Sequence, residues 1–286
     1  MPKKVNSKFA FQKNIQAHAR RLNATFSGLE QSVANIVLAQ LVMRAEHLTD
    51  QQFYFKGGTS LLFRFGIETA RTTQDIDMTI AADRERIESL ILDLAGVRWN
   101  QFKVKGVKVV KTIAPSWVAE EKRLLKFKVQ IAFGESEWRT VVIEATTDEF
   151  DSSNSSERLS GEILSEPFQR LGLEVPSTVP VMQTELQIAQ KIHACLTPMS
   201  VRGHDLYDIY KMLEVSNVDI TELARLVRQT FDSRGRHVWN TSFSPSEELK
   251  AQYLRETHGI DGTPNFEDAL QTFSALLVLI DDAMSN

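Results

Sequence analysis

The feature that most constrains the fold of this chain is the pair Gly57-Gly58, which we call the corner and which separates two segments of different character. Gln52–Lys56 holds the aromatic run Phe-Tyr-Phe and stops at Gly57-Gly58, which is typical of a strand that ends in a turn. Thr59 and Ser60 follow the corner and can cap a helix over the next apolar residues. In Arg71–Ile80, which reads RTTQDIDMTI, apolar and polar residues alternate, and this pattern predicts a second strand.

The Gly57-Gly58 corner suits a phosphate group. A Gly-Gly turn exposes backbone N–H groups, and a helix that starts at Thr59 points its positive dipole end at the same place. Tight turns also need glycine for steric reasons alone. The corner is therefore weak evidence of function without a second feature.

Asp75 and Asp77 supply that second feature. Strand residues two apart project from one face about 6.5–7 Å apart, close enough for two carboxylates to bind the same divalent cations. Like charges at that distance repel unless a cation neutralises them, and the apolar neighbours Ile76 and Met78 predict a partly buried site. The alternative is a solvated strand face that carries two surface aspartates.

The corner and the two aspartates together meet the needs of phosphoryl or nucleotidyl transfer, a phosphate-binding turn beside a metal clamp. Such a site also needs a third carboxylate on an adjacent strand. We expect Glu144, because in the predicted strand Thr140–Thr147 it shares a face with Val142. Gln130, on the predicted strand Leu124–Phe133, stands where another acid could have been.

Three ordered blocks over residues 53–211 resemble a known family. FYFKGGTSLLFRF…RTTQDIDM resembles the GG(T/S)…S-x-D-x-D motif of the AbiEii-type nucleotidyltransferases, the toxin halves of abortive-infection toxin–antitoxin pairs, which include the MenT-type toxins. VIEATTDE is similar to that family's IEISYRE strand. AQKIHACLTPMSVRGHDLYDIYKML resembles its later A-x-K-x-x-A…R…D-x-x-D block. The last 75 residues match only loosely.

The resemblance implies an α+β fold, with a polymerase-β-like nucleotidyltransferase core of mixed sheet followed by a helical C-terminal domain. It implies that Asp75 and Asp77 bind metal ions, and that Lys191 and Asp205 or Asp208 complete the catalytic set. We expect Mg²⁺ or Mn²⁺ as the ion, with Glu144 as third ligand or base. The residues then expected to contact the nucleoside triphosphate are Lys56, Gly57, Gly58, Thr59, Ser60, Thr73 and Lys191.

The sequence departs from the family pattern at two positions. Thr73 stands where the family usually has serine, and this change keeps a hydroxyl. Asp148 replaces a basic residue at the end of the strand motif, which puts substrate contacts there in doubt.

The later block is less informative when it is judged from its residues alone. Lys191 lies on a predicted helix with an apolar face, where a lysine is most often solvated, although its point charge also suits phosphate oxygens. Asp205 and Asp208 fall on one helical face, and a salt bridge to Arg202 is the structural alternative to a catalytic role. Cys195 is expected to be a small core residue.

The remaining pattern divides the chain into two domains. A core helix is expected over Glu30–Glu46 and another over residues 83–94, whereas residues 151–161 are expected to form a polar loop. After Pro176 and Pro180 the chain is expected to be helical to its end, apart from a break near 258–265. We therefore predict a nucleotidyltransferase α/β domain over residues 1–175 and a helical domain over residues 176–286.

Basic residues gather in two places in a chain with 33 Lys and Arg against 37 Asp and Glu. Residues 103–128 have a net charge of +6. Strand-edge lysines that discourage aggregation are one explanation, and a phosphate-backbone track for RNA is the other. The track could extend to Arg234 and Arg236, and to the first 29 residues, a basic amphipathic arm without an acid. A transit peptide is the alternative for that arm.

Composition excludes several classes of protein. Hydrophobic residues make up 42% and charged residues 24%, which is typical of a soluble globular protein. No apolar run approaches the 18–20 residues of a membrane span. A single cysteine excludes an internal disulfide and a thiolate zinc cluster, so we expect a cytoplasmic protein.

We therefore predict a toxin that transfers a nucleoside monophosphate from an NTP to an RNA acceptor. The family resemblance implies the tRNA 3′ end as acceptor, a block of translation and a cognate antitoxin protein as partner; DNA and membrane are not expected partners. Two alternatives stay open. The acceptor could be a protein or small-molecule hydroxyl, or the chain could be a non-catalytic module that binds NTP or RNA.

Overall fold

The structure is a computed structural model that describes residues 5–111, 124–147, 156–235 and 237–285. The chain forms two compact units, Met1–Met182 and Gln183–Asn286. In the part of the chain that the structure describes, none of the helices combines the length and the apolar character that crossing a bilayer requires. The predicted boundary between functional domains, at residues 175 and 176, stays a prediction.

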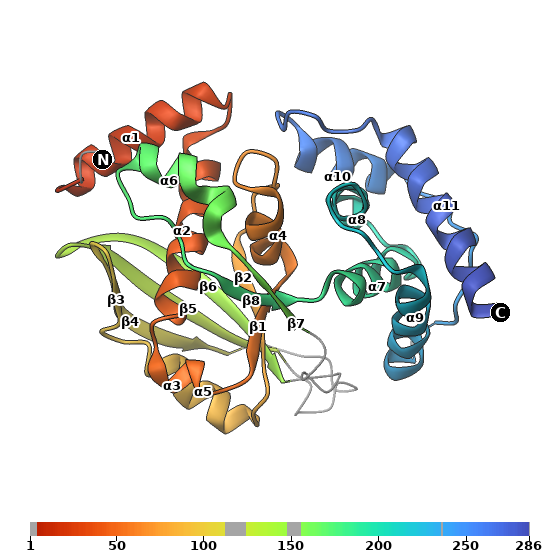
Figure 1. The fold of residues 1–286 in the computed structure, drawn as a ribbon, viewed down its shortest axis with the longest axis horizontal. Coiled ribbons are helices and arrows are strands. Elements are labelled where there is room, and N and C mark those ends of the chain that lie inside the picture. Colours follow the sequence, from red (N-terminus) through yellow and green to blue (C-terminus); the bar gives the residue numbers. More distant parts are fainter. Residues whose placement is uncertain (1–4, 112–123, 148–155, 236, 286) are drawn as a thin grey trace. The chain divides into compact units, whose positions relative to one another are not determined.

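An eight-stranded mixed sheet forms the framework of the first unit (Figure 1). The strands lie in the order β3-β4-β5-β6-β2-β1-β8-β7. Their bounds are β1 Phe53–Lys56, β2 Asp75–Ile80, β3 Arg98–Trp99, β4 Phe102–Val110, β5 Leu125–Phe133, β6 Ser136–Thr147, β7 Ser156–Leu159 and β8 Val179–Met182. The mixed α+β fold agrees with the prediction.

Strand β2 lies between β1, which is antiparallel to it, and β6, which is parallel to it. The register places Asp77 opposite Lys56 on one side and opposite Glu144 on the other. Residues that pair directly across neighbouring strands project from the same face of the sheet. The three side chains therefore share one face.

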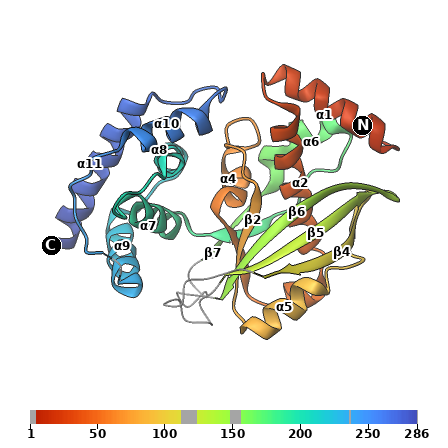
Figure 2. The same cartoon turned by 180° about the vertical axis from the view of Figure 1, so that it is seen from behind.

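Helices α2 and α5 pack against the sheet. Helix α2 (Phe26–Val42) contacts β2, β4 and β6, and α5 (Arg84–Leu92) lies alongside β4 (Figure 2). Alternate residues of β5, from Leu125 to Ile131, are buried, because alternate side chains of a strand point to opposite faces. The predicted core helix is confirmed, although it starts at Phe26 and ends at Val42.

Four local predictions need correction. β2 starts at Asp75 and not at Arg71, because residues 71–74 do not pair with a neighbouring strand. The helix after the corner, α4, starts at Gly57, so Lys56 is its N-cap and Thr59 and Ser60 lie inside it. Part of the predicted polar loop forms β7, and the stretch after Pro176 first forms β8. The edge strand β7 pairs with β8, and β8 also pairs with β1.

The basic N-terminal arm forms helix α1 (Lys8–Arg21), which packs beside α6 (Ser165–Leu171) (Figure 1). Its amphipathic character is confirmed, because Phe11, Ile15 and Ala19 are fully buried whereas Phe9 is 79% exposed. The Phe11 ring stacks on Phe133 with 5.1 Å between centroids. Helix α1 is therefore part of the hydrophobic core.

The second unit is built from helices. They are α7 (Thr184–Cys195), α8 (Gly203–Val215), α9 (Ile220–Arg234), α10 (Glu247–Thr257) and α11 (Phe266–Ser285). Helix α7 packs against α8 and α9, and α8 packs against α10 and α11. Cys195 is buried, as predicted.

Two phenylalanines of α1 offer a matched test of its place in the core. We expect Phe11→Ala to lower the free energy of unfolding by about 3–5 kcal/mol, because it leaves a cavity among aromatic rings. Phe9→Ala should change it by less than about 0.5 kcal/mol, since Phe9 is exposed. Denaturant unfolding measures both values, and equal effects would contradict the assignment.

Candidate active site

Asp75 and Asp77 project from one face of β2, as predicted from the alternation. Both are half-buried, whereas Ile76 and Met78 between and beside them are fully buried on the other face. Glu144 on β6 lies opposite Asp77 in the parallel register. The structure therefore brings the three predicted metal-binding acids to one surface of two neighbouring strands.

The glycine corner packs directly against this acidic group. Gly57 has φ +59°, and a Cβ atom built on it would lie 2.1 Å from Oδ2 of Asp77. A Cβ atom on Gly58 would lie 2.5 Å from Cβ of Thr73. Real side chains do not approach that closely, so both positions need glycine, and Gly57 also needs its left-handed backbone conformation. The N-terminus of α4 thus abuts the Asp77 carboxylate.

The hydroxyl groups around the corner brace its backbone. Thr59 and Ser60 are fully buried; Thr59 Oγ1 donates to the Asp75 carbonyl at 3.4 Å, and Ser60 Oγ donates to the Gly57 carbonyl at 2.8 Å. Thr73 Oγ1 donates to Oδ1 of Asp75 at 3.3 Å. The hydroxyl kept at position 73 therefore orients the first aspartate. Contact of these residues with a nucleotide stays a prediction.

Buried polar residues of α2 hold the start of β2, a role that was not predicted from the sequence. Asn35 Nδ2 donates to the carbonyl oxygens of Thr73 and Asp75, and Gln31 Nε2 donates to the Gln74 carbonyl. Gln31 Oε1 accepts in turn from Nε of Arg139 on β6. Polar residues four apart in an otherwise apolar helix were the available signal.

Negative charge is concentrated at the three acids. Burial, and then the nearby Glu144 carboxylate, raise the pKa of Asp75 above its ordinary value. Lys126 on β5 supplies a counter-charge, with Nζ 2.5 Å from Oε1 of Glu144. Lys56, opposite Asp77, donates to Oγ1 of Thr146 at 2.8 Å. The arrangement is one that favours cations.

The chemistry of these donors suits a divalent metal ion. Hard cations such as Mg²⁺ and Mn²⁺ prefer carboxylate oxygens, and three carboxylates on two paired strands provide them. In this structure Lys126 pairs with Glu144, and the oxygens of the three acids do not all lie within 4.8 Å of one another. A cavity of about 480 Å³ is lined by residues that include Tyr54, Arg158 and Pro180, and by none of the three acids.

The later predicted residues form a buried ion cluster in the second unit. Lys191 Nζ lies 2.6 Å from Oδ1 of Asp205 and 2.7 Å from Oδ2 of Asp208, and both carboxylates are fully buried. Arg202 also contacts Asp205, so the salt bridge named as the alternative is present. Burial opposes ionisation of Asp205, but the charges of Lys191 and Arg202 bring its pKa below the ordinary value. A catalytic role for the three stays a prediction.

Part of the basic segment lies on the same face as the acids. Lys128 on β5 pairs with Val142, which pairs with Asp75, and Lys108 on β4 pairs with Lys128. Both lysines are exposed. Lys122, Arg123, Asp148 and Arg236 lie outside the described residues.

Two glycines with the same φ of +59° allow a matched test of the corner. We expect Gly57→Ala to lower the free energy of unfolding by more than Gly134→Ala, which should cost about 1–2 kcal/mol. The reason is that a Cβ at Gly134 meets no atom within 4 Å, whereas at Gly57 it strikes Asp77. Equal midpoints of denaturant unfolding would show that the corner is looser than described.

We also expect Lys191→Met to lower the free energy of unfolding by about 3–5 kcal/mol, because two buried carboxylates lose their shared counter-ion. Lys250→Met, which removes an exposed lysine paired with Glu267, should leave the thermal midpoint unchanged. Calorimetry compares the two variants. An unchanged midpoint for Lys191→Met would contradict the described cluster.

Comparison with known proteins gives the family. No curated protein matches the sequence. MenT4, the nucleotidyltransferase toxin Rv2826c from Mycobacterium tuberculosis H37Rv, has a similar fold, with a TM-score of 0.54 and 17% sequence identity over 95% of this chain and 98% of that chain. The model of the nucleotidyl transferase AbiEii toxin of type IV toxin–antitoxin systems matches residues 40–277. The chain therefore belongs to the AbiEii family of nucleotidyltransferase toxins.

Proposed function

We propose that this protein transfers a nucleoside monophosphate from an NTP to the 3′ end of tRNA in a reaction that depends on Mg²⁺ or Mn²⁺. One observation carries the proposal: Asp75, Asp77 and Glu144 share a face of two paired strands, and Gly57 packs against Asp77. An antitoxin partner follows from membership of a type IV toxin–antitoxin family. The expected location is the cytoplasm, where tRNA is charged.

The three acids would hold the metal ions. The raised pKa of Asp75 reflects burial beside a second carboxylate, a cost that a bound cation would relieve. Divalent ions bound there would neutralise charge on the triphosphate and on the attacking oxygen. Lys126 would release Glu144 when the cations bind, because the ammonium and the metal ions compete for the same carboxylate.

The N-terminus of α4 would receive the phosphate groups. The nine-residue helix starts at Gly57, and the side chain of its N-cap residue Lys56 does not form a capping hydrogen bond. Its first N–H groups and its dipole favour an anion at that end. Gly57, Gly58 and Thr59 are the proposed backbone contacts. Ser60 and Thr73 would keep the corner in place, and Lys56 would contribute positive charge.

The chemical step is an in-line displacement at the α-phosphorus. The 3′-hydroxyl oxygen of the acceptor forms a bond to the α-phosphorus while the bond to the β-phosphate oxygen breaks, and pyrophosphate leaves. The hydroxyl proton passes to a carboxylate of the site, for which Glu144 is the candidate. Asp205 or Asp208 would complete the catalytic set, as the family resemblance implies.

The lysines beside the acids favour a nucleic-acid acceptor. With neighbouring strands about 4.8 Å apart, the register puts Lys128 about 10 Å and Lys108 about 14 Å from Asp75 across the sheet. Like charges directly opposite each other destabilise a sheet, so this pair suggests a role beyond folding. Phosphate groups of an RNA strand would neutralise both lysines while its 3′ end reaches the acids.

A transfer assay tests this proposal. Purified protein is incubated with Mg²⁺, each α-³²P-labelled NTP in turn and total RNA, and the products are separated into RNA and protein. We expect label on tRNA, at least about 100-fold less label with Asp75→Asn or Asp77→Asn, and unchanged labelling with Asp261→Asn, an exposed aspartate of the other unit.

Lys108→Gln together with Lys128→Gln should raise the KM for tRNA and leave kcat unchanged. The reason is that these side chains would bind only the RNA backbone. Label on protein alone would favour the alternative acceptor. Growth inhibition that survives both aspartate substitutions would favour a non-catalytic binding module and contradict the proposal.

A further inference from the structure

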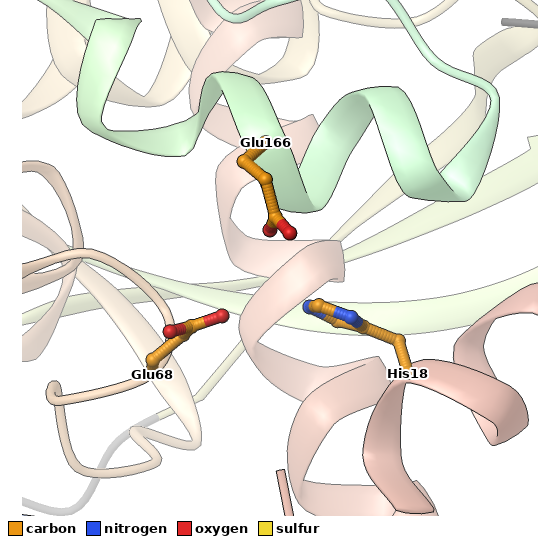
Figure 3. Close-up of side chains that lie close together, drawn as sticks. All are labelled: His18, Glu68 and Glu166. Carbon is orange, nitrogen blue, oxygen red and sulfur yellow. The ribbon is translucent and has the colours of Figure 1, made fainter. Parts of the chain in front are cut away.

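A second cluster of metal-binding side chains lies away from the three acids (Figure 3). It contains His18 of α1, Glu68 in the turn after α4, and Glu166 of α6. One ligand atom from each lies within 4.8 Å of the other two, and among the described residues no other group of three His, Cys, Asp or Glu side chains meets that criterion. The carboxylates and the imidazole converge from three separate elements.

His18 is the unusual member of this cluster. Its side chain is 4% exposed, and within the described chain neither ring nitrogen has a hydrogen-bond partner. A buried imidazole without a partner is costly, because the ring has lost its hydrogen bonds to water. Figure 3 shows the imidazole ring of His18 pointing toward the two glutamates, with one ring nitrogen at the end nearer to them.

The known ion pairs of the cluster leave His18 unexplained. Arg21 contacts Glu68 at 2.8 Å and Glu166 at 3.3 Å, and Arg170 also contacts Glu166. These guanidinium groups satisfy the carboxylates but not the imidazole. Both glutamates are about half exposed, 46% and 50%, so an ion can reach the cluster from solvent on their side.

We propose that His18, Glu68 and Glu166 bind a divalent transition metal, with Zn²⁺ as the best fit. One imidazole nitrogen and two carboxylate oxygens suit Zn²⁺, whereas Mg²⁺ and Ca²⁺ prefer oxygen ligands alone. Ligand atoms around a tetrahedral ion lie about 3.4 Å apart, so closure requires side-chain shifts on the order of 1 Å. A fourth position would hold water.

The protonation state of His18 is compatible with this role. Burial, and then the neighbouring Arg21 guanidinium, lower the pKa of His18. The carboxylates of Glu166 and Glu68 raise this pKa more weakly, and the charge of Arg170 adds a small decrease. A lowered pKa favours the neutral imidazole, which is the form that binds metal ions.

The ion would join three parts of the first unit. It would connect α1 and α6 to the turn between α4 and β2, the turn that links the Gly57 corner to Asp75. The Arg21 guanidinium and the metal ion would compete for the carboxylates of Glu68 and Glu166, so the ion pairs of Arg21 would break when the ion binds. The site would thus stabilise the unit that carries the three acids.

The experiment uses full-length, untagged protein that carries Asp77→Asn to weaken ion binding at the acids. The protein is stripped with a chelator and dialysed against Zn²⁺, and the bound metal and the thermal midpoint are measured. We expect one Zn²⁺ per chain, and an increase in the midpoint of about 5–10 °C at a hundredfold excess of free ion over Kd.

Single substitutions then assign the ligands. His18→Gln, Glu68→Gln and Glu166→Gln should each weaken binding at least about tenfold, whereas His258→Gln, which changes an exposed histidine, should not. Arg21→Gln should tighten binding, because it removes the competing cation. The glutamate variants keep the test valid if His18→Gln fails to fold, since both glutamates are half exposed.

Two results would overturn the proposal. One is the absence of bound Zn²⁺ at micromolar free ion. The other is equal affinity in His18→Gln, the glutamate variants and His258→Gln, which would place the ion elsewhere.

Discussion

The close approach of the Gly57 backbone to the Asp77 carboxylate is the constraint on which the site depends. It leaves no room for a side chain at position 57, it sets the left-handed turn between β1 and α4, and it brings the helix N-terminus beside an acid on the neighbouring strand. The parallel pairing of β2 with β6 then adds Glu144. Strand register and one glycine therefore place three acids and a positive helix end on one surface.

The arrangement concentrates negative charge, and the protein compensates for it locally. Lys126 neutralises Glu144, whereas burial, and then the nearby Glu144 carboxylate, raise the pKa of Asp75. Buried amides of α2 fix the backbone that carries Asp75, so the acids cannot relax apart freely. A site that is held together against electrostatic repulsion is pre-organised for cations, which agrees with the nucleotidyltransferase family of the chain.

Much of this could be predicted from the sequence, because the signals were local. The alternation of apolar and polar residues along β2 predicted that Asp75 and Asp77 share one face. The same alternation along β6 led to the prediction of Glu144 as the third carboxylate. What could not be predicted depends on distant contacts. The pairing of β7 with β8, the hydrogen bonds of Asn35 and the contacts of Lys191 with two aspartates join residues on different elements, and periodicity does not reveal such partners. The burial of α1 in the core was not predicted for the same reason, because it depends on the contact of Phe11 with the distant Phe133.

Locating the ions themselves would show directly whether Asp75 and Asp77 bind metal. Crystals of the protein grown with Mn²⁺ and a non-hydrolysable NTP analogue would be measured at a wavelength where manganese scatters anomalously. We expect anomalous peaks about 2.0–2.3 Å from the oxygens of Asp75 and Asp77, with the triphosphate at the N-terminus of α4. Manganese bound elsewhere, with the two aspartates still facing only protein atoms, would contradict it.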